Sequence, residues 1–327
     1  MGCLITGITG FVGSHLADYL LKETNADING LTRWRYPKDN VLHLVDNDRI
    51  IFQHGDLTDF SSLYKILNKT RPEFIFHLAA QSYVLYSFDV PLATLDSNVL
   101  GTCNLLESVK LLKEEDGYDP VIHICSSSEV YGQVEEKNVP IKEDCPFNPA
   151  SPYAVSKVGE DMLGLQYWLS WGIKIIRTRV FTHTGPRRGD VFVVAAFAKQ
   201  IAKIEANLQD AVIKVGNLDS VRTFVDVRDI VKAYWLLVNK CEPGKVYNIG
   251  GNVTMTIHEM LKKLIDMSSK KDELTIKVDS NLFRPSDVTL QIPCVDKFVE
   301  RTGWKPEIPF NQTLLDTLNF WRNYYAR

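Results

Sequence analysis

Tyr153 and Lys157 are the first pair of residues in this chain whose types and spacing could do chemistry. They lie four residues apart, which puts both side chains on one face of a helix. A tyrosine with its ordinary pKa of about 10 ionises near neutrality only with electrostatic help, and a neighbouring ammonium group provides such help. Upstream, Ser127 and Glu129 stand in a hydroxyl-rich run that follows an apolar segment. We interpret Ser127, Glu129, Tyr153 and Lys157 as a catalytic acid–base group.

The pattern around these residues predicts a parallel sheet that would position them. Short apolar runs alternate with helix-period segments through the first half of the chain, which is typical of βαβ units. The expected strands are 3–6, 27–32, 50–54, 73–78, 120–125 and 173–180. The expected helices are 11–22, 61–68, 95–115, 153–171 and 192–206. Ser127 then follows the carboxyl end of a strand, where open parallel sheets bind their ligands.

A glycine-rich loop stands between the first expected strand and the first expected helix. Gly7, Gly10 and Gly13 have the spacing GxxGxxG, and Phe11 and Val12 open the helix. A turn without side chains lets backbone N–H groups and the helix N-terminus approach a pyrophosphate. We expect these five residues to bind a dinucleotide cofactor.

The residue after the second strand discriminates between the two nicotinamide cofactors. An NAD enzyme carries an acid at this point, which accepts a hydrogen bond from the ribose 2′-hydroxyl. Arg33 stands there instead, and a guanidinium group pairs with a 2′-phosphate. The sequence therefore predicts NADP, with NAD as the less favoured alternative.

The regular alternation fades after about residue 181, which predicts two lobes that interleave in sequence. The expected fold is α/β, a Rossmann-like doubly wound parallel sheet with a smaller mixed α/β C-terminal lobe. Residues 1–180 would form the NADP-binding domain, completed by about 223–250, where a strand and a helix return to the sheet. Residues 181–222 and 251–327 would form the smaller lobe.

Composition and charge argue against several classes of protein. The net charge of −3 gives no overall attraction to nucleic acid or to an anionic membrane. No apolar stretch approaches the roughly 20 residues that span a bilayer. The six cysteines have neither a CxxC pair nor metal-ligand spacing. We therefore expect a cytoplasmic protein with reduced thiols and with no metal, membrane or nucleic-acid partner.

Several motifs resemble those of the extended short-chain dehydrogenase/reductases, and the resemblance covers nearly the whole chain. It rests on the glycine loop, His54-Gly55-Asp56-Leu57, Leu78-Ala79-Ala80-Gln81-Ser82, Ser127-Ser128-Glu129, Tyr153 with Lys157, and Arg284-Pro285-Ser286-Asp287. Within this family the chain is most similar to the branch of GDP-mannose 4,6-dehydratase and GDP-4-keto-6-deoxymannose reductase. The resemblance implies a Rossmann domain joined to a lobe that binds a sugar nucleotide.

The resemblance also implies roles for individual residues. Ser127 would donate to the sugar, Tyr153 would be the acid/base, and Lys157 would also bind the cofactor ribose. Further cofactor contacts would come from Asp56, Leu57, Leu78, Ala79 and Ala80, and Asn98 would be the buried asparagine behind the site. The substrate would be bound by Ser82, Ser128, Arg187, Arg188, Asn217, Arg222, Arg284 and Asp287. Guanidinium forks match phosphate oxygens, so the arginines suit a nucleoside diphosphate.

One glutamate favours a dehydratase over a reductase. The dehydratase reaction oxidises C4 by hydride transfer to NADP, eliminates water across C5–C6 and returns the hydride to C6. Elimination needs a second acid/base, and Glu129 matches the pattern of 4,6-dehydratases by resemblance. The loop 185–192 also resembles the dehydratase, whereas 214–229 resembles the reductase, and Thr182 departs from both. The alternatives are an NADPH-dependent GDP-4-keto-6-deoxymannose reductase and the same dehydration on a GDP-heptose.

Family members usually pair through the two long helices beside the active site. In this chain those helices are expected at 95–115 and 153–171. The resemblance thus implies a homodimer, with a tetramer as the alternative, and a nucleotide sugar as the substrate partner.

Overall fold

The computed structural model describes residues 1–286 and 288–326. These residues form a seven-stranded parallel sheet in the order β10-β6-β5-β4-β1-β2-β3. Its strands are β1 (Gly2–Thr6), β2 (Asp27–Thr32), β3 (Ile50–His54), β4 (Phe74–His77), β5 (Val121–Ser127), β6 (Ile175–Val180) and β10 (Val246–Ile249). The order is that of a doubly wound Rossmann sheet, so the predicted fold class is confirmed.

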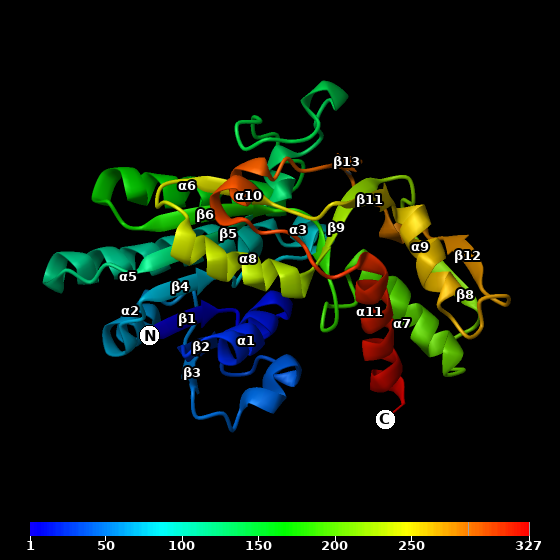
Figure 1. Cartoon of the computed structure of the whole chain (residues 1–327), viewed down its shortest axis with the longest axis horizontal. Helices are drawn as coiled ribbons and strands as arrows, with labels where there is room; N and C mark the ends of the chain where they lie inside the picture. The colour runs from blue at the N-terminus through cyan, green and yellow to red at the C-terminus, as the bar shows by residue number, and fades with distance from the viewer. Residues whose placement is uncertain (287, 327) are drawn as a thin grey trace.

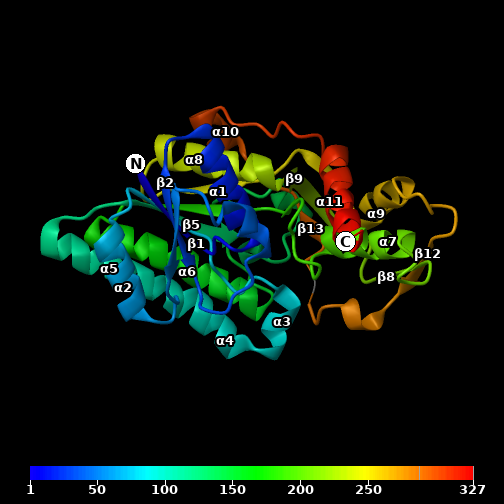
Figure 2. The same cartoon turned by 90° about the horizontal axis from the view of Figure 1, so that it is seen from below.

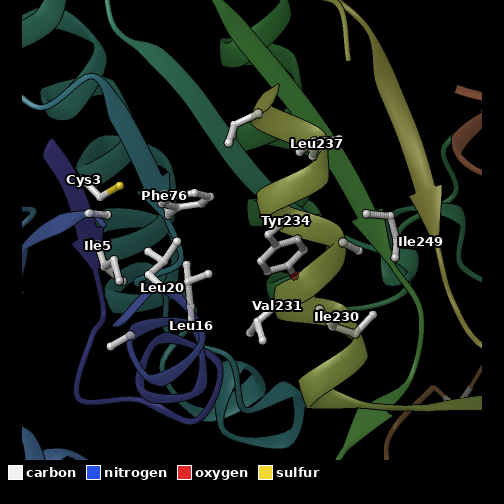
Figure 3. Packing of buried hydrophobic residues seen from close by; sticks show 14 of the residues in the cluster. Cys3, Ile5, Leu16, Leu20, Phe76, Ile230, Val231, Tyr234, Leu237 and Ile249 are labelled. Atoms are coloured by element: carbon white, nitrogen blue, oxygen red, sulfur yellow. The ribbon is translucent and has the colours of Figure 1, made fainter. Parts of the chain in front are cut away.

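Helices cover both faces of this sheet (Figures 1 and 2). On one face α1 (Phe11–Glu23) packs against α8 (Val227–Lys240), and on the other α2 (Phe60–Thr70) and α6 (Pro152–Trp171) flank α5 (Gly101–Asp116). Each face has its own apolar core. Figure 3 shows the first of them, where Leu16 and Leu20 of α1 point toward Val231 and Tyr234 of α8.

The helix that carries the catalytic pair has clear start and stop signals. The Ser151 side chain accepts a hydrogen bond from the Ala154 N–H group at 3.1 Å, and Pro152 occupies the first helical position. Gly172 ends the helix with a left-handed backbone, φ 60°. These residues make α6 begin next to the end of β5, against which it packs.

One expected helix, 95–115, consists of three pieces. The structure has α4 (Pro91–Leu95), a π-helical turn (Asp96–Leu100) and then α5. The π turn contains Asn98, whose side chain is fully buried. A wide turn of this kind often lies at a functional site, where it re-aims a side chain.

The smaller lobe lies to the right of the sheet in Figure 1. In the described residues it has a sheet of order β11-β9-β13, with β7 beside β9, and a pair β12-β8. Its strands are β7 (His183–Thr184), β8 (Val212–Val215), β9 (Val221–Asp226), β11 (Val253–Thr256), β12 (Thr275–Val278) and β13 (Leu290–Gln291). Its helices α7 (Val193–Glu205), α9 (Ile257–Asp266) and α11 (Phe310–Tyr325) enclose a separate apolar core.

The chain crosses between these parts at points that differ from the expected boundaries. We expected about 223–250 to complete the first domain; α8 and β10 do pack there, whereas β9 pairs with β11 in the smaller sheet. Conversely, α10 (Asp296–Thr302) and Trp304 pack in the first core, although they were expected in the lobe. The rings of Phe298 and Trp304 find an apolar surface against β10 and α8, which the sequence order does not reveal.

Two further features bear on the class of protein. All six cysteines of the described structure are free thiols. Within residues 1–286 and 288–326, no helix is long and apolar enough to cross a lipid bilayer.

Candidate active site

The predicted catalytic residues meet at the carboxyl edge of the sheet. Ser127 is the last residue of β5, and Tyr153 lies in the first turn of α6. The Ser127 hydroxyl accepts a hydrogen bond from the Glu129 N–H group at 3.2 Å. The Tyr153 N–H group donates to the hydroxyl of Ser87 at 3.1 Å, which fixes the start of α6.

The charge state of Tyr153 depends on opposing influences. Burial raises its pKa, whereas the Lys157 ammonium and a hydrogen bond with Ser127 lower it. A half-buried tyrosine beside a cation can serve as an acid–base centre. The arrangement can therefore take a proton from a substrate hydroxyl group and return it.

Lys157 is paired with a residue that sequence reasoning missed. Its Nζ atom donates to Oε2 of Glu160 at 2.6 Å, and the two side chains are 5% and 1% exposed. Burial opposes the charge of Lys157, but Glu160, Tyr153 and Cys125 together outweigh it and raise the pKa of the ammonium group. The available signal was the spacing, because an acid three residues after a lysine shares its helix face.

Asn98 supports the site from behind. Its Nδ2 atom donates to the Ser156 hydroxyl at 2.8 Å and to the Gln81 carbonyl at 3.0 Å, and its Oδ1 atom accepts from the Gln81 N–H group at 2.8 Å. It therefore ties α6 to the loop that follows β4.

The glycine loop is shaped by close backbone contacts. A Cβ atom added to Gly13 would lie 2.2 Å from the Gly7 carbonyl oxygen, and one added to Gly7 would lie 2.9 Å from Cα of Ala79. Gly7 also has a left-handed backbone, φ 73°. In the described chain, the N-cap residue Gly10 offers no side chain to the first N–H groups of α1, so they suit a phosphate.

The other predicted cofactor residues lie along the same edge of the sheet as this loop. The Leu78 and Ala79 N–H groups donate to the Thr6 hydroxyl at 3.0 and 3.1 Å, which joins β1 to the segment that continues with Ala80. Asp56 and Leu57 follow β3; the Asp56 carboxylate accepts from Thr58, and Leu57 is buried. Phe11 and Val12 are half-buried in the first turn of α1.

Arg33 lies on the same edge of the sheet as the glycine loop. It follows β2, which pairs with β1, and its side chain is exposed. Its guanidinium group lies 5.0 Å from the ring centre of Tyr36. β2 ends at Thr32, so neither its last residue nor Arg33 directly after it is an acid.

The neighbouring residues Arg187 and Arg188 contact different parts of the protein. Arg187 has a left-handed backbone, φ 68°, and its Nη1 atom lies 2.7 Å from the Asp18 carboxylate of α1. Arg188 lies between Phe11 and Phe192, with its guanidinium carbon 4.8 and 3.5 Å from their ring centres. Burial lowers the pKa of Arg188 to about 10. Arg188 therefore lies on the glycine-loop side of the site, whereas Arg187 contacts the back of α1.

One catalytic candidate, Glu129, and one substrate candidate, Arg284, lie close together near the end of β5, and a further substrate candidate belongs to β9. Glu129 has a side chain 15% exposed, and its Oε1 atom lies 3.8 Å from Nη1 of Arg284. Arg222 of β9 is buried and donates to the carbonyls of Val221 and Val288. The acid Glu129 thus lies next to Ser127, and Arg284 lies next to Glu129.

The remaining candidates are placed less centrally. The Ser128 hydroxyl is buried and donates to Gln291 of β13 at 3.2 Å, so it joins β5 to the smaller sheet. Asn217 donates to the Ser220 hydroxyl, and Ser82 is exposed. Asp287 lies outside the described residues.

A Rossmann sheet with a glycine loop and a Ser, Tyr-x-x-x-Lys group at its carboxyl edge defines a short-chain dehydrogenase/reductase. The sequence profile of the family described as GDP-mannose 4,6 dehydratase matches residues 4–317. The chain belongs to this family, so the predicted resemblance is confirmed.

Two curated relatives represent different activities. The chain is 35% identical over 320 residues to a GDP-6-deoxy-D-mannose reductase of Pseudomonas aeruginosa, covering 98% of this chain and 96% of the relative. It is 32% identical over 338 residues to a GDP-mannose 4,6-dehydratase of Yersinia enterocolitica, covering 93% and 89%. The family thus contains both reactions.

The solved structures are similar over the whole length. The structure of RMD from Pseudomonas aeruginosa in complex with NADPH has a TM-score of 0.83 and 34% identity, covering 99% of both chains. A UDP-glucose 4-epimerase of Thermotoga maritima with UDP-glucose has a TM-score of 0.86 and 26% identity, again covering 99% of both chains. The two lobes of this chain therefore occur together in related sugar-nucleotide enzymes.

Proposed function

We propose that this chain is an NADP-dependent sugar-nucleotide 4,6-dehydratase that acts on GDP-mannose or a close GDP-sugar. The observation that carries the proposal is the position of Glu129. Its N–H group is bonded to the Ser127 hydroxyl, and its carboxylate is partly exposed beside Arg284. A second acid/base thus stands next to the Tyr153 centre, as elimination across C5–C6 requires.

The residues of the chain fit the cofactor and the reaction. NADP supplies a hydride acceptor for C4 and a donor for C6, and the glycine loop with Arg33 suits its phosphates. Tyr153 removes the proton of the C4 hydroxyl, and Lys157 stabilises the phenolate. Ser127 hydrogen-bonds the sugar oxygen. Glu129 takes the C5 proton and passes it to the departing C6 hydroxyl, which leaves as water. C5 would then regain a proton when C6 is reduced, which balances the one that Tyr153 removed from the C4 hydroxyl.

The smaller lobe would bind the nucleotide part of the substrate. Arg284 lies at its junction with the sheet, and Arg222 belongs to its central strand. Both suit a diphosphate because a guanidinium group donates two parallel hydrogen bonds to phosphate oxygens. On this division, 181–226 and most of the residues after 250 form the sugar-nucleotide lobe.

A second candidate function is the NADPH-dependent reduction of GDP-4-keto-6-deoxymannose. It is favoured by the match to the Pseudomonas aeruginosa reductase, which spans 96% of that relative. Reduction at C4 uses Tyr153 and Lys157 but requires no base at C5. Glu129 therefore discriminates between the two functions.

The test is product analysis with two substrates. With GDP-mannose and NADP, the dehydratase forms a product lighter by one water without net NADPH formation, which mass spectrometry and absorbance detect together. With the 4-keto-6-deoxy sugar, a reductase consumes NADPH stoichiometrically. The proposal would be refuted in favour of the reductase by two results together. GDP-mannose and a GDP-heptose would give no product, and the 4-keto-6-deoxy sugar would be reduced with steady NADPH consumption.

Two variants assign the steps to residues. Glu129→Gln should slow dehydration by about 10²–10⁴-fold while C4 oxidation survives, because only the elimination base is lost. Tyr153→Phe should abolish both reactions while NADPH still binds. Dehydration that proceeds unimpaired in Glu129→Gln would contradict the role of this acid.

We further infer that the enzyme works in the cytoplasm as a homodimer. The free thiols support a reducing compartment. An apolar surface hollow of about 690 Å³ beside α6 supports pairing; it is lined by Leu92, Ala93, Leu95, Asp96, Val99 and Leu100. Light scattering that finds a monomer at micromolar concentration would contradict the dimer.

A further inference from the structure

A buried ion pair lies directly behind Tyr153 on the same face of α6. The Lys157 ammonium donates to Oε2 of Glu160 at 2.6 Å, and both side chains are almost inaccessible to solvent. Within the described residues, Oε1 of Glu160 is buried without a hydrogen-bond partner. The lysine of the catalytic pair is therefore held by a carboxylate that is only half satisfied.

The next residue shows what a structural carboxylate looks like at this depth. Asp161 is fully buried, and both of its oxygens accept hydrogen bonds: Oδ1 from Arg177 at 2.6 Å and Oδ2 from Arg179 at 2.8 Å. A buried carboxylate with both oxygens bonded can stabilise a fold, whereas one with an orphan oxygen carries a desolvation cost. The orphan oxygen of Glu160 thus carries a desolvation cost that the carboxylate of Asp161 avoids.

The groups around Glu160 carry little free charge of their own. On β4 and β5, burial lowers the pKa of His77 and His123 to about 3, so both rings are neutral. On β5 and α8, burial raises the pKa of Cys125 and Tyr234, which are also neutral near pH 7.

Beside these neutral groups, the two positive charges of β6 are compensated only in part, because they share one carboxylate. Arg177 and Arg179 pair with Asp161 on α6. The charged neighbours that shift the pKa of Tyr153 are Lys157, which lowers it, and Glu160, which raises it, while Asp161 in turn raises the pKa of Glu160.

We propose that Glu160 is a positioning residue that holds the Lys157 ammonium and tunes its effect on Tyr153. When Glu160 is ionised, the pair has almost no net charge, and the electrostatic support for the Tyr153 phenolate is weak. When Glu160 is protonated, the full positive charge of Lys157 acts on Tyr153. This inference rests on the proposed function in one respect, the use of Tyr153 and Lys157 with a nicotinamide cofactor.

The balance changes within the neutral pH range. Burial raises the pKa of Glu160 to about 7, against the opposing effect of Lys157. As the pH rises through 7, Glu160 therefore becomes negative and raises the pKa of Tyr153. Activity that depends on the Tyr153 phenolate should then increase less steeply with pH than it would if Lys157 acted on Tyr153 without Glu160.

The experiment replaces Glu160 by glutamine, which keeps a hydrogen-bond acceptor for Lys157 and removes the charge. The tyrosine limb of the pH–kcat profile should move to lower pH by up to about 1 unit. NADPH should bind about threefold more tightly than to the wild type at pH 8, because a negative charge beside Lys157 is gone. The two dissociation constants should converge at pH 6, where Glu160 is protonated.

A matched control removes the same charge elsewhere. Glu107→Gln on α5 changes a carboxylate that accepts from the Tyr167 hydroxyl of α6. Its pH profile and its NADPH affinity should stay those of the wild type. A shift of equal size in the control would show a general effect of charge and would overturn the inference.

A second variant keeps the inference testable if the glutamine variant does not fold. Glu160→Asp retains the charge but shortens the side chain, so kcat should fall severalfold while the tyrosine limb keeps its wild-type position. A wild-type kcat in this variant would overturn the positioning role.

Measurements of NADPH binding and of the pH profile also distinguish a failure of this inference from a failure of the proposed function. A wild-type protein that binds no NADPH at any pH would refute the proposed function. NADPH binding that is the same in Glu160→Gln and the wild type at pH 8, with the same pH profile, would refute the Glu160 inference alone.

Discussion

The two sides of the active site are built in different ways. On the cofactor side the backbone itself makes the surface, and atoms added to Gly7 or Gly13 would collide with neighbouring backbone. On the predicted substrate side the surface consists of long side chains, and Arg222 and Arg284 already contact protein groups. One side is therefore preformed, whereas the other can rearrange when a diphosphate competes for its guanidinium groups.

This difference predicts how sensitive each side is to substitution. A rigid backbone surface cannot absorb an extra methyl group, because packed interiors deform little. On a surface made of side chains, by contrast, the loss of a side chain whose partner lies outside the site should have little effect on ligand binding. The following substitutions test this contrast from its strongest to its weakest consequence.

Gly13→Ala should give the largest effect. The new Cβ would lie 2.2 Å from the Gly7 carbonyl oxygen, so the loop and the start of α1 must shift. We expect about 1–3 kcal/mol lower free energy of unfolding and an NADPH dissociation constant raised more than about tenfold. Denaturant unfolding and a fluorescence titration measure the two quantities.

Gly2→Ala in β1 is the matched control for this variant. Its Cβ would lie 3.6 Å from the nearest atom, which is an ordinary contact. Both quantities should stay near the wild type there. Tight NADPH binding by Gly13→Ala would contradict a preformed phosphate site.

Arg33→Ala should have an intermediate effect, confined to the choice of cofactor. Loss of a charged hydrogen bond to the 2′-phosphate costs about 1.5–3 kcal/mol, which lowers the preference for NADP over NAD by at least about tenfold. The ratio of kcat/KM for the two cofactors measures it, with Arg35→Ala in the same exposed loop as control. A wild-type preference for NAD would refute the assignment.

Arg187→Ala should have the smallest effect. Its partner is the partly exposed Asp18 on the far side of α1, so we expect KM for the nucleotide sugar to change by less than about threefold. Arg188→Ala should raise KM at least about tenfold, because its guanidinium group lies between Phe11 and Phe192 at the site. Equal effects of the two variants in steady-state kinetics would remove the distinction between them.

The elements of the first half could be predicted closely. The strands at 27–32 and 50–54 agree with the structure at both ends, and the helix beginning near Tyr153 differs by one residue at its start. These segments repeat a local pattern, an apolar run followed by a capped amphipathic helix, that any βαβ unit imposes. The irregular π turn at Asn98 breaks that pattern and was missed.

The site could be predicted where chemistry follows from position along a strand or helix. Ser127 and the Tyr153–Lys157 pair were expected at one sheet edge, and the structure brings them there. Ser128 is predicted to bind substrate, and in the structure its hydroxyl donates to Gln291. The direction of its side chain depends on a distant segment, so no local pattern could reveal it.

The sequence by itself determined the parallel sheet, the glycine loop and the Tyr153–Lys157 pair, because each depends on spacing within one segment. Only the tertiary structure decided which partner each charge has. It set Arg187 and Arg188 apart through one left-handed residue, and it gave Lys157 a buried, half-satisfied carboxylate. Those pairings depend on how separate elements pack and on how far each group is removed from water.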